Sequence, residues 1–353
     1  MIPIRVLIVE DSSVVREILR QIVSSDPRFE VVASVGSAEE ALAVLDKVAP
    51  HVISLDIRLP GMQGLEATRR IMSHRPTPIV VVSAAGESEE LNLTMEALRA
   101  GALSVIEKPA AQTRPDYESL AGRICTQLAI MSEVQVVRQY GGNGAAGKVG
   151  TAPVRSPFHP FPHVPYKVLG IVASTGGPPA IVQLLNGLGK TFPLPVVLVQ
   201  HMTPSFIEGF GAWLAGVSPF AVEFVAGPVP LSPGKLYLAR EDRHLVVDGR
   251  FVRVSGGDPE SSHLPSGNVL FSSMARDGAG IGVLLTGMGD DGARGLLDLR
   301  RAGGYTIAED QSTAIVHGMP AAAVRLGAAC EVLPLPAIAP RILELVQAVP
   351  EAK

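Results

Sequence analysis

The stretch IGVLLTGMGDDGARGLLDLRRAG, residues 281–303, decides the fold of the second half of the chain. It reads as an apolar strand, a glycine-rich turn and an amphipathic helix, which together form the repeating unit of a doubly wound parallel sheet. The turn, Thr286–Gly292, also carries Gly-x-Gly-x-x-Gly. Acids follow about twenty residues later, the spacing of a dinucleotide-binding fingerprint. The sequence therefore raises the question of whether these glycines bind a nucleotide.

The residues inside the turn argue against a nucleotide. The two variable positions before its last glycine are Asp290 and Asp291, whose carboxylates would repel a pyrophosphate. The other glycine-rich loop, ASTGG at residues 173–177, lacks the lysine of a P-loop and does not form Gly-x-Ser-x-Gly. We therefore expect a tight bend that presents backbone N–H groups and a carboxylate, and no cofactor in this half.

Length and composition are those of a globular protein. The 353 residues suffice for two domains, and 47% hydrophobic with 18% charged residues suit packed cores. The net charge of −4 is scattered along the chain, which predicts no nucleic-acid partner. Cys125 and Cys330 are too distant in sequence to indicate a disulfide framework or a metal knuckle. The N-terminus reaches acids too soon for a signal peptide, and no apolar run has membrane-spanning length, so we expect a cytoplasmic protein without membrane insertion.

Residues 1–125 predict a flavodoxin-like, doubly wound parallel sheet. Short apolar segments alternate with amphipathic ones, and this alternation of strand and helix is typical of an α/β fold. The predicted strands are residues 5–9, 29–35, 51–57, 78–84 and 103–107, and the predicted helices are residues 13–25, 37–49, 65–74, 90–101 and 117–131.

A linker is predicted at residues 126–165, where GGNGAAGKVG and TAPVRSPFHPFPHVP concentrate glycine and proline. From 166 to 353 the α/β pattern resumes and predicts a second doubly wound domain, Rossmann-like and three-layered. A small antiparallel β addition is predicted at residues 235–255 around an Asp-Gly turn. The other predicted elements are strands at residues 167–174, 194–201, 281–289 and 305–310, and a closing helix at residues 338–349.

Polar residues follow the predicted strands of the first domain. Glu10 and Asp11 follow the first strand, Asp56 the third, Ser83 the fourth and Lys108 the fifth, and such strand ends meet at one edge of the sheet. Clustered carboxylates need a cation, and oxygen ligands suit Mg²⁺. The hydroxyl and the lysine could hold phosphoryl oxygens, with Asp56 as the nucleophile. Each acid alone could be a helix cap or a solvated loop residue, but suitable residues at successive strand ends argue against that alternative.

The first domain resembles a response-regulator receiver domain in the motifs LIVEDS, SLDIRLPGMQGLE, VVVSA and EKPA. The resemblance implies that Asp56 accepts a phosphoryl group from a sensor histidine kinase. It also implies that Glu10, Asp11 and the backbone carbonyl of Arg58 help Asp56 to hold Mg²⁺.

The resemblance further implies that Ser83 and Lys108 report phosphorylation. The family usually carries Phe or Tyr two or three residues before the lysine. Val105 and Ile106 occupy that neighbourhood here, so we expect a weak or absent aromatic switch and modest activation.

The second domain places a hydroxyl, an imidazole and a carboxylate at strand ends. Ser174, His201 and Asp291 follow three predicted strands, and if these strands are neighbours they supply a nucleophile, a general base and an orienting acid. Each residue has a structural alternative: Ser174 and Asp291 could cap helices, and His201 could be a satisfied polar group. The joint arrangement favours a hydrolase.

The motifs STGGPPA, QHM, LTGMGDDG and EDQSTAIVHGMPAAAV resemble the catalytic domain of the chemotaxis protein-glutamate methylesterases, the CheB family. The resemblance implies hydrolysis of glutamyl methyl esters on methyl-accepting chemoreceptors, with release of methanol, and in many members deamidation of receptor glutamines. Ser174 is then the nucleophile, His201 the base and Asp291 the orienting acid. Thr175 and the backbone N–H of Met288 would assist the oxyanion.

One stretch departs from the family. HLPSGNVLF, residues 263–271, has Leu264, Gly267 and Asn268 where the family commonly has arginine, valine and an acid. This departure and the missing aromatic switch leave two other hypotheses open. One is a receiver-gated interaction module of a chemosensory-like pathway with a retuned or dispensable esterase, and the other is a hydrolase directed to another esterified protein.

Overall fold

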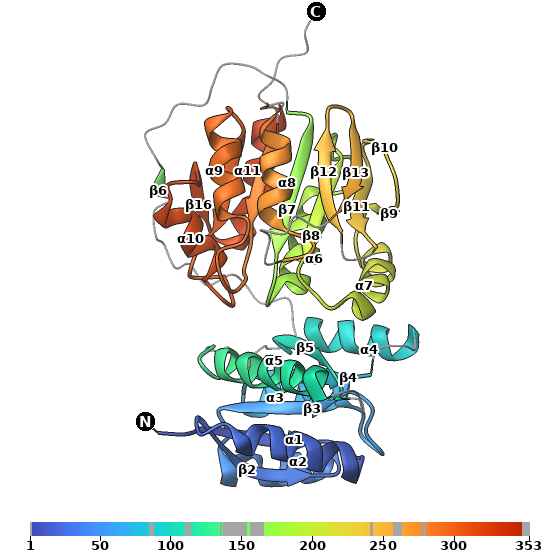
Figure 1. The fold of residues 1–353 in the computed structure, drawn as a ribbon, viewed down its shortest axis with the longest axis vertical. Coiled ribbons are helices and arrows are strands. Elements are labelled where there is room, and N and C mark those ends of the chain that lie inside the picture. Colours follow the sequence, from blue (N-terminus) through green and yellow to red (C-terminus); the bar gives the residue numbers. More distant parts are fainter. Residues whose placement is uncertain are drawn as a thin grey trace, which may run out of the picture. The chain divides into compact units, whose positions relative to one another are not determined.

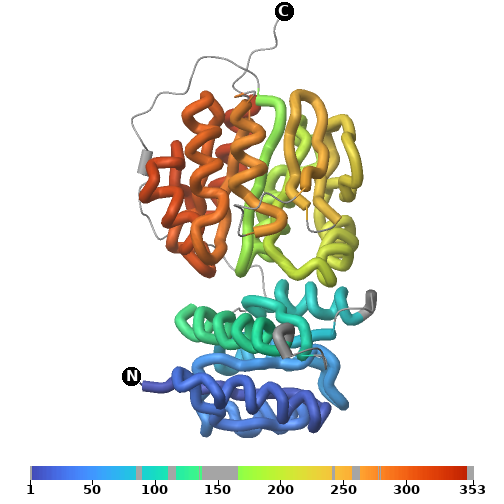
Figure 2. Tube along the Cα trace, in the orientation of Figure 1, coloured from blue at the N-terminus to red at the C-terminus, as the bar shows by residue number. Residues whose placement is uncertain are grey.

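A computed structural model describes residues 2–84, 88–109, 114–134, 136, 154–155, 166–240, 243–256, 263–276, 278 and 280–347. The chain divides into two compact units, Met1–Lys148 and Val149–Lys353, whose ribbons and backbone traces are drawn in Figure 1 and Figure 2. Much of the predicted linker, residues 126–165, lies outside the described residues. No helix of the described residues is long and apolar enough to cross a membrane.

The first unit is a five-stranded parallel sheet in the order β2-β1-β3-β4-β5. This order confirms the doubly wound prediction, because β2 lies on one side of β1 and β3 on the other. The strands are β1 (Ile4–Val9), β2 (Phe29–Val35), β3 (Val52–Asp56), β4 (Ile79–Ser83) and β5 (Ser104–Glu107), and the helices are α1 (Ser13–Ser25), α2 (Ala38–Val48), α3 (Gly64–His74), α4 (Ser88–Arg99) and α5 (Arg114–Ser132).

Helix starts in this unit follow from local hydrogen bonds. Ser37 Oγ accepts from Glu40 N at 3.2 Å, and Glu40 Oε2 accepts from Gly36 N at 3.0 Å. Two N–H groups at the start of α2 are thereby satisfied by the serine and the glutamate together. Ser12 caps α1 in the same way by accepting from Val15 N. Helix α1 consequently begins close behind the end of β1, where Glu10 and Asp11 lie.

The second unit contains an eight-stranded sheet in the order β6-β16-β15-β14-β7-β8-β11-β9. All its neighbours are parallel except β6 and β16. A separate antiparallel sheet has the order β10-β13-β12. The strands are β6 (Val154–Arg155), β7 (Val168–Ala173), β8 (Val196–Gln200), β9 (Ala221–Val225), β10 (Val229–Pro230), β11 (Lys235–Ala239), β12 (His244–Asp248), β13 (Phe251–Ser255), β14 (Gly280–Leu284), β15 (Tyr305–Glu309) and β16 (Glu331–Leu333), and the helices are α6 (Gly177–Leu188), α7 (Pro204–Val217), α8 (Gly267–Ala275), α9 (Ala293–Arg301), α10 (Met319–Arg325) and α11 (Leu335–Gln347).

The antiparallel addition predicted at residues 235–255 is confirmed in part. β12 and β13 form the expected hairpin, but β11, which was assigned to the same addition, is instead a parallel strand of the main sheet. Residues 236–239 are buried one after another. Such a run is typical of a strand covered on both faces rather than one face of a hairpin.

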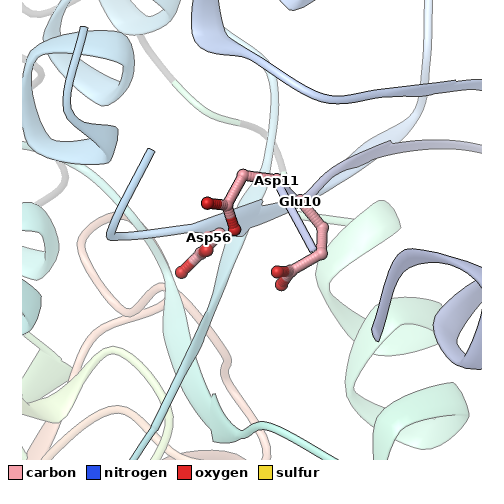
Figure 3. Close-up of side chains that lie close together, drawn as sticks. All are labelled: Glu10, Asp11 and Asp56. Atoms are coloured by element: carbon pink, nitrogen blue, oxygen red, sulfur yellow. The ribbon is translucent and has the colours of Figure 1, made fainter. Parts of the chain in front are cut away.

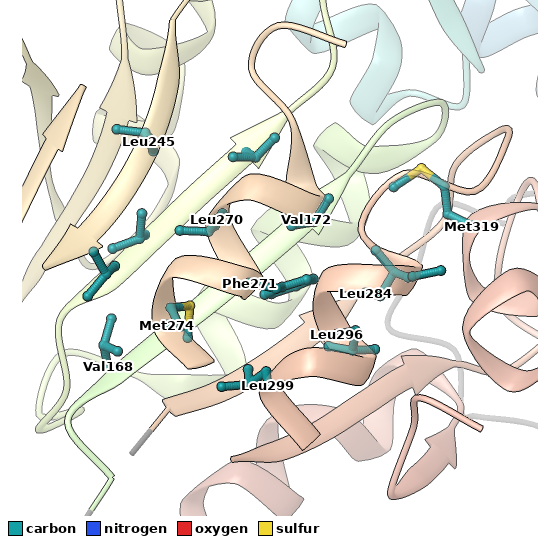
Figure 4. Close-up of a cluster of buried hydrophobic side chains, with 14 of the residues drawn as sticks. Val168, Val172, Leu245, Leu270, Phe271, Met274, Leu284, Leu296, Leu299 and Met319 are labelled. Atoms are coloured by element: carbon teal, nitrogen blue, oxygen red, sulfur yellow. The ribbon is translucent and has the colours of Figure 1, made fainter. Parts of the chain in front are cut away.

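The core of the second unit lies between the sheet and the helix pair α8 and α9. Phe271 of α8 and Leu296 of α9 are fully buried against Val172 of β7 and Leu284 of β14, and Figure 4 shows these side chains together. Each such burial stabilises the fold by about 1.5–3 kcal/mol. This packing fixes the ends of β7 and β14, which lie at the switch point of the sheet. It also fixes the start of each of the two helices beside them.

Candidate functional sites

Three carboxylates meet at the carboxyl edge of the first sheet. Glu10 and Asp11 follow β1, and Asp56 ends the adjacent strand β3. One oxygen from each of the three side chains lies within 4.8 Å of the others, and Figure 3 shows the three side chains close together. Glu10 and Asp56 are buried and Asp11 is exposed. The cluster occupies the switch point of the sheet, where doubly wound folds bind ligands.

Lys108 neutralises part of this cluster. Its Nζ donates to Asp56 Oδ2 at 2.7 Å and lies 3.2 Å from Glu10 Oε2. Burial acts to lower the pKa of Lys108, but its hydrogen bond to Asp56 and the charges of Asp56 and Glu10 raise that pKa overall. The ammonium group therefore stays charged beside the acids.

The cluster fits a small hard cation. Burial raises the pKa of Glu10 to about 7, reinforced by the charge of Asp56 and opposed by Lys108. Burial also raises the pKa of Asp56. Apart from Lys108 Nζ at 3.2 Å, buried Glu10 Oε2 has no polar partner among the described residues, and oxygen-only donors of this kind suit Mg²⁺. Arg58 N donates to Asp56 Oδ1 at 3.1 Å, whereas the Arg58 carbonyl as a metal ligand stays a prediction.

Ser83 is hydrogen-bonded to helix α4. Its hydroxyl donates to Glu90 Oε1 at 2.7 Å and accepts from Thr94 Oγ1 at 3.1 Å. Ala84 N also donates to Glu90 Oε1, at 2.7 Å, and Arg58 Nε lies 3.2 Å from Glu90 Oε2. Glu90 was not predicted as part of the site, because nothing in the sequence indicates that an acid in a helix, seven residues after Ser83, contacts the strand end.

The predicted catalytic residues follow three adjacent strands, β14, β7 and β8. Ser174 follows β7, His201 follows β8, and Asp291 lies in the turn after β14. His201 Nε2 lies 2.8 Å from Asp291 Oδ2. Because a carboxylate accepts, we assign the proton to Nε2, which leaves Nδ1 as the basic nitrogen. No hydrogen bond joins the Ser174 hydroxyl to His201 in the described part of the chain, and such bonds commonly tighten only when substrate binds.

Gln200 joins the two strand ends that carry Ser174 and His201. Its Nε2 donates to the carbonyl oxygens of Ser174 at 2.8 Å and His201 at 2.9 Å. The side chain is 3% exposed, and Ser174 N is fixed from the other side by Thr286 O at 3.0 Å. The sequence analysis missed Gln200, although an amide at the end of a buried strand was an available signal.

Asp291 lies at the N-terminus of helix α8. It accepts from Ser266 Oγ at 2.8 Å, Gly267 N at 2.6 Å and Asn268 N at 3.1 Å. Burial acts to raise the pKa of Asp291, but the hydrogen bond and charge of His201 and the donors of Gly267 and Ser266 hold that pKa well below its usual range. The carboxylate therefore stays ionised, as an orienting acid must.

The divergent stretch 263–271 thus supplies the surroundings of the triad. Asp291 does not cap its own helix, whose N-cap is Gly292. Asn268, at the position where the family commonly has an acid, accepts from Gly295 N at 2.9 Å and so links α8 to α9. Leu264 is 39% exposed, and nothing in the structure explains its replacement of arginine.

His263 is a second residue that the sequence analysis missed as part of the site. Its ring stacks on the ring of His201, with centroids 4.7 Å apart and planes inclined by 16°. Burial lowers the pKa of His263, and the charge of His201 lowers it further, against the opposing influence of Asp291 and Asp290. A neutral aromatic ring therefore covers the base.

The residues predicted to assist the oxyanion lie beside Ser174. Thr175 is 9% exposed, and its carbonyl accepts from Thr286 Oγ1 at 2.9 Å. Met288 is 41% exposed and follows Gly287, where a Cβ atom would lie 2.8 Å from the Ser174 Cβ. Glycine at 287 is thus required for close approach to Ser174. The oxyanion roles of Thr175 and Met288 stay predictions.

A buried acid lies behind the same turn. Glu309 ends β15, and its Oε2 accepts from Thr286 N at 2.8 Å. Its Oε1 is buried without a hydrogen bond from the described residues. Burial raises the pKa of Glu309 to about 7, although the Thr286 N–H and the Thr313 hydroxyl act to lower it.

These two units define a class of protein, a response regulator whose output domain is a parallel α/β unit with a strand-end serine beside a histidine–aspartate pair. Comparison with known families narrows the class. The model of the response regulator receiver domain matches residues 6–114, and that of CheB methylesterase matches residues 169–342. The chain belongs to the CheB methylesterase family, and the resemblance of both halves is confirmed.

Relatives of this family match nearly the whole chain. A protein-glutamate methylesterase/protein-glutamine glutaminase 2 of Paramagnetospirillum magneticum is 56% identical over 97% of both chains. A protein-glutamate methylesterase/protein-glutamine glutaminase of Nitrosospira multiformis is 42% identical over 97% of both. The crystal structure of the Thermotoga maritima CheB methylesterase catalytic domain has 34% identity and a TM-score of 0.49, covering 52% of this chain and 100% of that one. The family match and the names of the two relatives that span nearly the whole chain favour the enzyme hypothesis over a binding module without esterase function.

Proposed function

We propose that this protein hydrolyses glutamyl methyl esters on methyl-accepting chemoreceptors in the cytoplasm, under the control of phosphorylation at Asp56. The observation that carries the esterase proposal is the contact between His201 Nε2 and Asp291 Oδ2 at 2.8 Å beside the strand-end Ser174. The names of the full-length relatives supply the substrate class.

In the proposed reaction, His201 acts alternately as base and acid. Ser174 Oγ attacks the ester carbonyl while His201 Nδ1 takes the hydroxyl proton. The developing oxyanion is stabilised by the Met288 N–H and by Thr175. His201 then gives its proton to the departing methoxide, so methanol leaves and an acyl-serine remains. Water, deprotonated by His201, then attacks the acyl-serine; the acyl–oxygen bond breaks, glutamate leaves, and His201 returns the proton to Ser174 Oγ. A glutamine substrate would follow the same route with ammonia as the leaving group.

In the receiver domain, the Asp56 carboxylate would attack the phosphorus atom of a phosphohistidine on a sensor kinase. The P–N bond breaks and a P–O bond to Asp56 forms. Glu10, Asp11, Asp56 and the Arg58 carbonyl would hold Mg²⁺, which neutralises charge on the phosphoryl oxygens when bound. Lys108, which is 2.7 Å from Asp56 Oδ2, would release that oxygen and pair with the phosphoryl group.

The test is methanol release from methylated receptor membranes by the full chain. Wild type should release methanol, and Ser174→Ala should abolish release while leaving the thermal unfolding temperature unchanged, because it removes the nucleophile and only one hydroxyl. Residual turnover within about tenfold of wild type would exclude Ser174 as the nucleophile. Wild-type protein that binds receptor membranes and releases no methanol would overturn the esterase proposal.

A further inference from the structure

Asp291 fixes the His201 imidazole at only one atom. The hydrogen bond from Nε2 to Oδ2, at 2.8 Å, does not by itself set the plane of the ring. A general base must keep its other nitrogen in the plane of the attacking hydroxyl, because small misplacements cost rate. A second restraint on the ring plane is therefore needed, and a ring stacked face to face provides one.

We propose that His263 is a positioning residue for His201: its ring, acting as an uncharged aromatic plate, holds the His201 imidazole with Nε2 on Asp291 and Nδ1 available to Ser174. The stacking distance of 4.7 Å and the inclination of 16° carry this inference, which rests on the proposed esterase function.

His263 belongs to an anchored segment. Three positions later, Ser266 N donates to Nδ1 of His244 at 3.1 Å, and His244 is 1% exposed. The Ser266 hydroxyl and Gly267 N hold the Asp291 carboxylate at 2.8 Å and 2.6 Å. The same segment therefore delivers both the acid and the stacked ring to the base, and their relative positions are fixed together.

The charge of His263 matters because His201 becomes a cation when it takes the serine proton. Among the described residues, the ionisable groups that act on His263 are His201, Asp291 and Asp290, and burial together with His201 favours the neutral form. A neutral ring face accommodates a neighbouring cation, whereas a second positive charge at this distance would oppose its formation. The plate must therefore be aromatic and uncharged.

The test compares three variants of the full chain. His263→Phe keeps a ring and loses the polar atoms, whereas His263→Gln keeps polar atoms and loses the ring. His263→Lys places a fixed positive charge beside His201. The kinetic constants for methanol release would be measured as a function of pH, with thermal unfolding as the control for folding.

The Phe variant should retain kcat within about threefold of wild type, whereas the Gln variant should lose about ten- to a hundredfold in kcat with KM little changed. The Lys variant should lower kcat and move the acidic limb of the kcat/KM profile to lower pH, because the added charge disfavours protonation of His201. A Gln variant as active as wild type, or a Phe variant as impaired as Gln, would overturn the proposal.

A measurement without turnover separates this proposal from the proposed function. In Ser174→Ala protein with ¹⁵N-labelled histidine, NMR reports the His201 tautomer directly. We expect the proton on Nε2 when residue 263 is His or Phe, and averaging between the two nitrogens when it is Gln. An unchanged tautomer in the Gln variant would overturn the positioning role, even if wild type released no methanol.

Discussion

Asp291 illustrates how much of an acid's chemistry its neighbours determine. Four donors converge on its two oxygens, from His201, Ser266, Gly267 and Asn268, and they keep the group ionised and fixed in direction. Asp290, its neighbour in the sequence, is exposed. Two adjacent acids of the same turn thus differ in their contacts: Asp291 is hydrogen-bonded and buried, whereas Asp290 is exposed.

We expect Asp291→Asn to reduce kcat for methanol release by roughly 10⁴-fold, as in comparable triads. The amide can donate to His201 Nε2 and thereby move the ring proton to Nδ1, where it blocks attack by Ser174. The matched control is Asp290→Asn, which makes the same chemical change one residue away and should stay within about threefold of wild type. If the two variants exchange these phenotypes, Asp290 is the orienting acid.

Glu309 predicts a pH-dependent stability effect. Its folded pKa of about 7 exceeds the ordinary value of 4.5, so protonation favours the fold, and that stabilisation is complete below about pH 4.5 and lost as pH rises through about 7. Glu309→Gln, which mimics the protonated acid, should therefore raise the free energy of unfolding by about 1–3 kcal/mol at pH 8 and change it little at pH 4.5.

Calorimetry at the two pH values measures this difference. The control is Glu331→Gln, since the buried Glu331 carboxylate is paired with Arg341 at 2.9 Å and its neutralisation should destabilise the domain. Equal stabilisation by Glu309→Gln at pH 4.5 and pH 8 would contradict the assignment of a raised pKa.

At the residue scale, the predicted strand ends were enough to identify the main polar residues of the two candidate sites. Asp56, Ser174 and His201 follow apolar runs, so their positions at a sheet edge were predictable from periodicity alone. Gln200, His263 and Glu90 were not nominated. Their roles depend on which loop approaches which strand end, and that is decided by tertiary packing between segments distant in sequence.

At the scale of elements, helix α4 is hydrogen-bonded to Ser83, the serine predicted to report phosphorylation. Glu90 accepts from the Ser83 hydroxyl and pairs with Arg58, at 2.7 Å and 3.2 Å. For Ser83 to donate to a phosphoryl oxygen on Asp56, it must first leave Glu90. The side chain of Glu90 therefore competes with the phosphoryl group for the proton of the Ser83 hydroxyl. When Ser83 donates to the phosphoryl group instead, α4 loses its hydrogen bond to the strand end and can move.

We expect Glu90→Gln to accelerate phosphorylation of Asp56 by acetyl phosphate by about three- to tenfold, because a neutral acceptor holds Ser83 less strongly than a carboxylate. Phosphoprotein would be measured over time in the full chain with Mg²⁺. Glu96→Gln removes the same charge from the same helix, where Glu96 pairs with Arg99 at 3.7 Å, and should leave the rate unchanged. Equal acceleration by both variants would indicate a general charge effect.

Strands and helices were predicted correctly where the spacing of apolar residues fitted only one type of element. The five strands of the first sheet and the hairpin β12–β13 were predicted because alternating or continuous apolar runs ended at clear turns. β9 was missed, since residues 221–225 combine a charged residue with only one buried position. β11 was assigned to the antiparallel addition because it precedes the hairpin closely. Its parallel pairing with β8 and β9 depends on a crossover that local sequence does not encode.

For the whole molecule, the sequence predicted two α/β units and a proline- and glycine-rich connection, and the division into two compact units is consistent with that organisation. The boundaries proposed from composition, residues 1–125, 126–165 and 166–353, remain a prediction, and residue 125 falls within α5, which continues to Ser132. How one unit influences the other is a question for experiment.

We expect a small phosphodonor to raise methanol release by the wild-type chain about five- to twentyfold, near the lower end of typical coupling, because Val105 replaces an aromatic switch residue. Asp56→Ala should keep basal release and show no response. Methanol would be measured with and without acetyl phosphate and Mg²⁺. A full response in Asp56→Ala would exclude that residue as the regulatory phosphorylation site.

The hydrogen bonds to Asp291 have a consequence for how such an enzyme can diverge. Two of its donors, the N–H groups of Gly267 and Asn268, belong to the main chain, and every residue except proline supplies such a donor. Substitutions at the exposed Leu264 therefore leave these donors in place. Over evolutionary time the exposed position 264 can therefore change while Asp291 keeps the same main-chain donors.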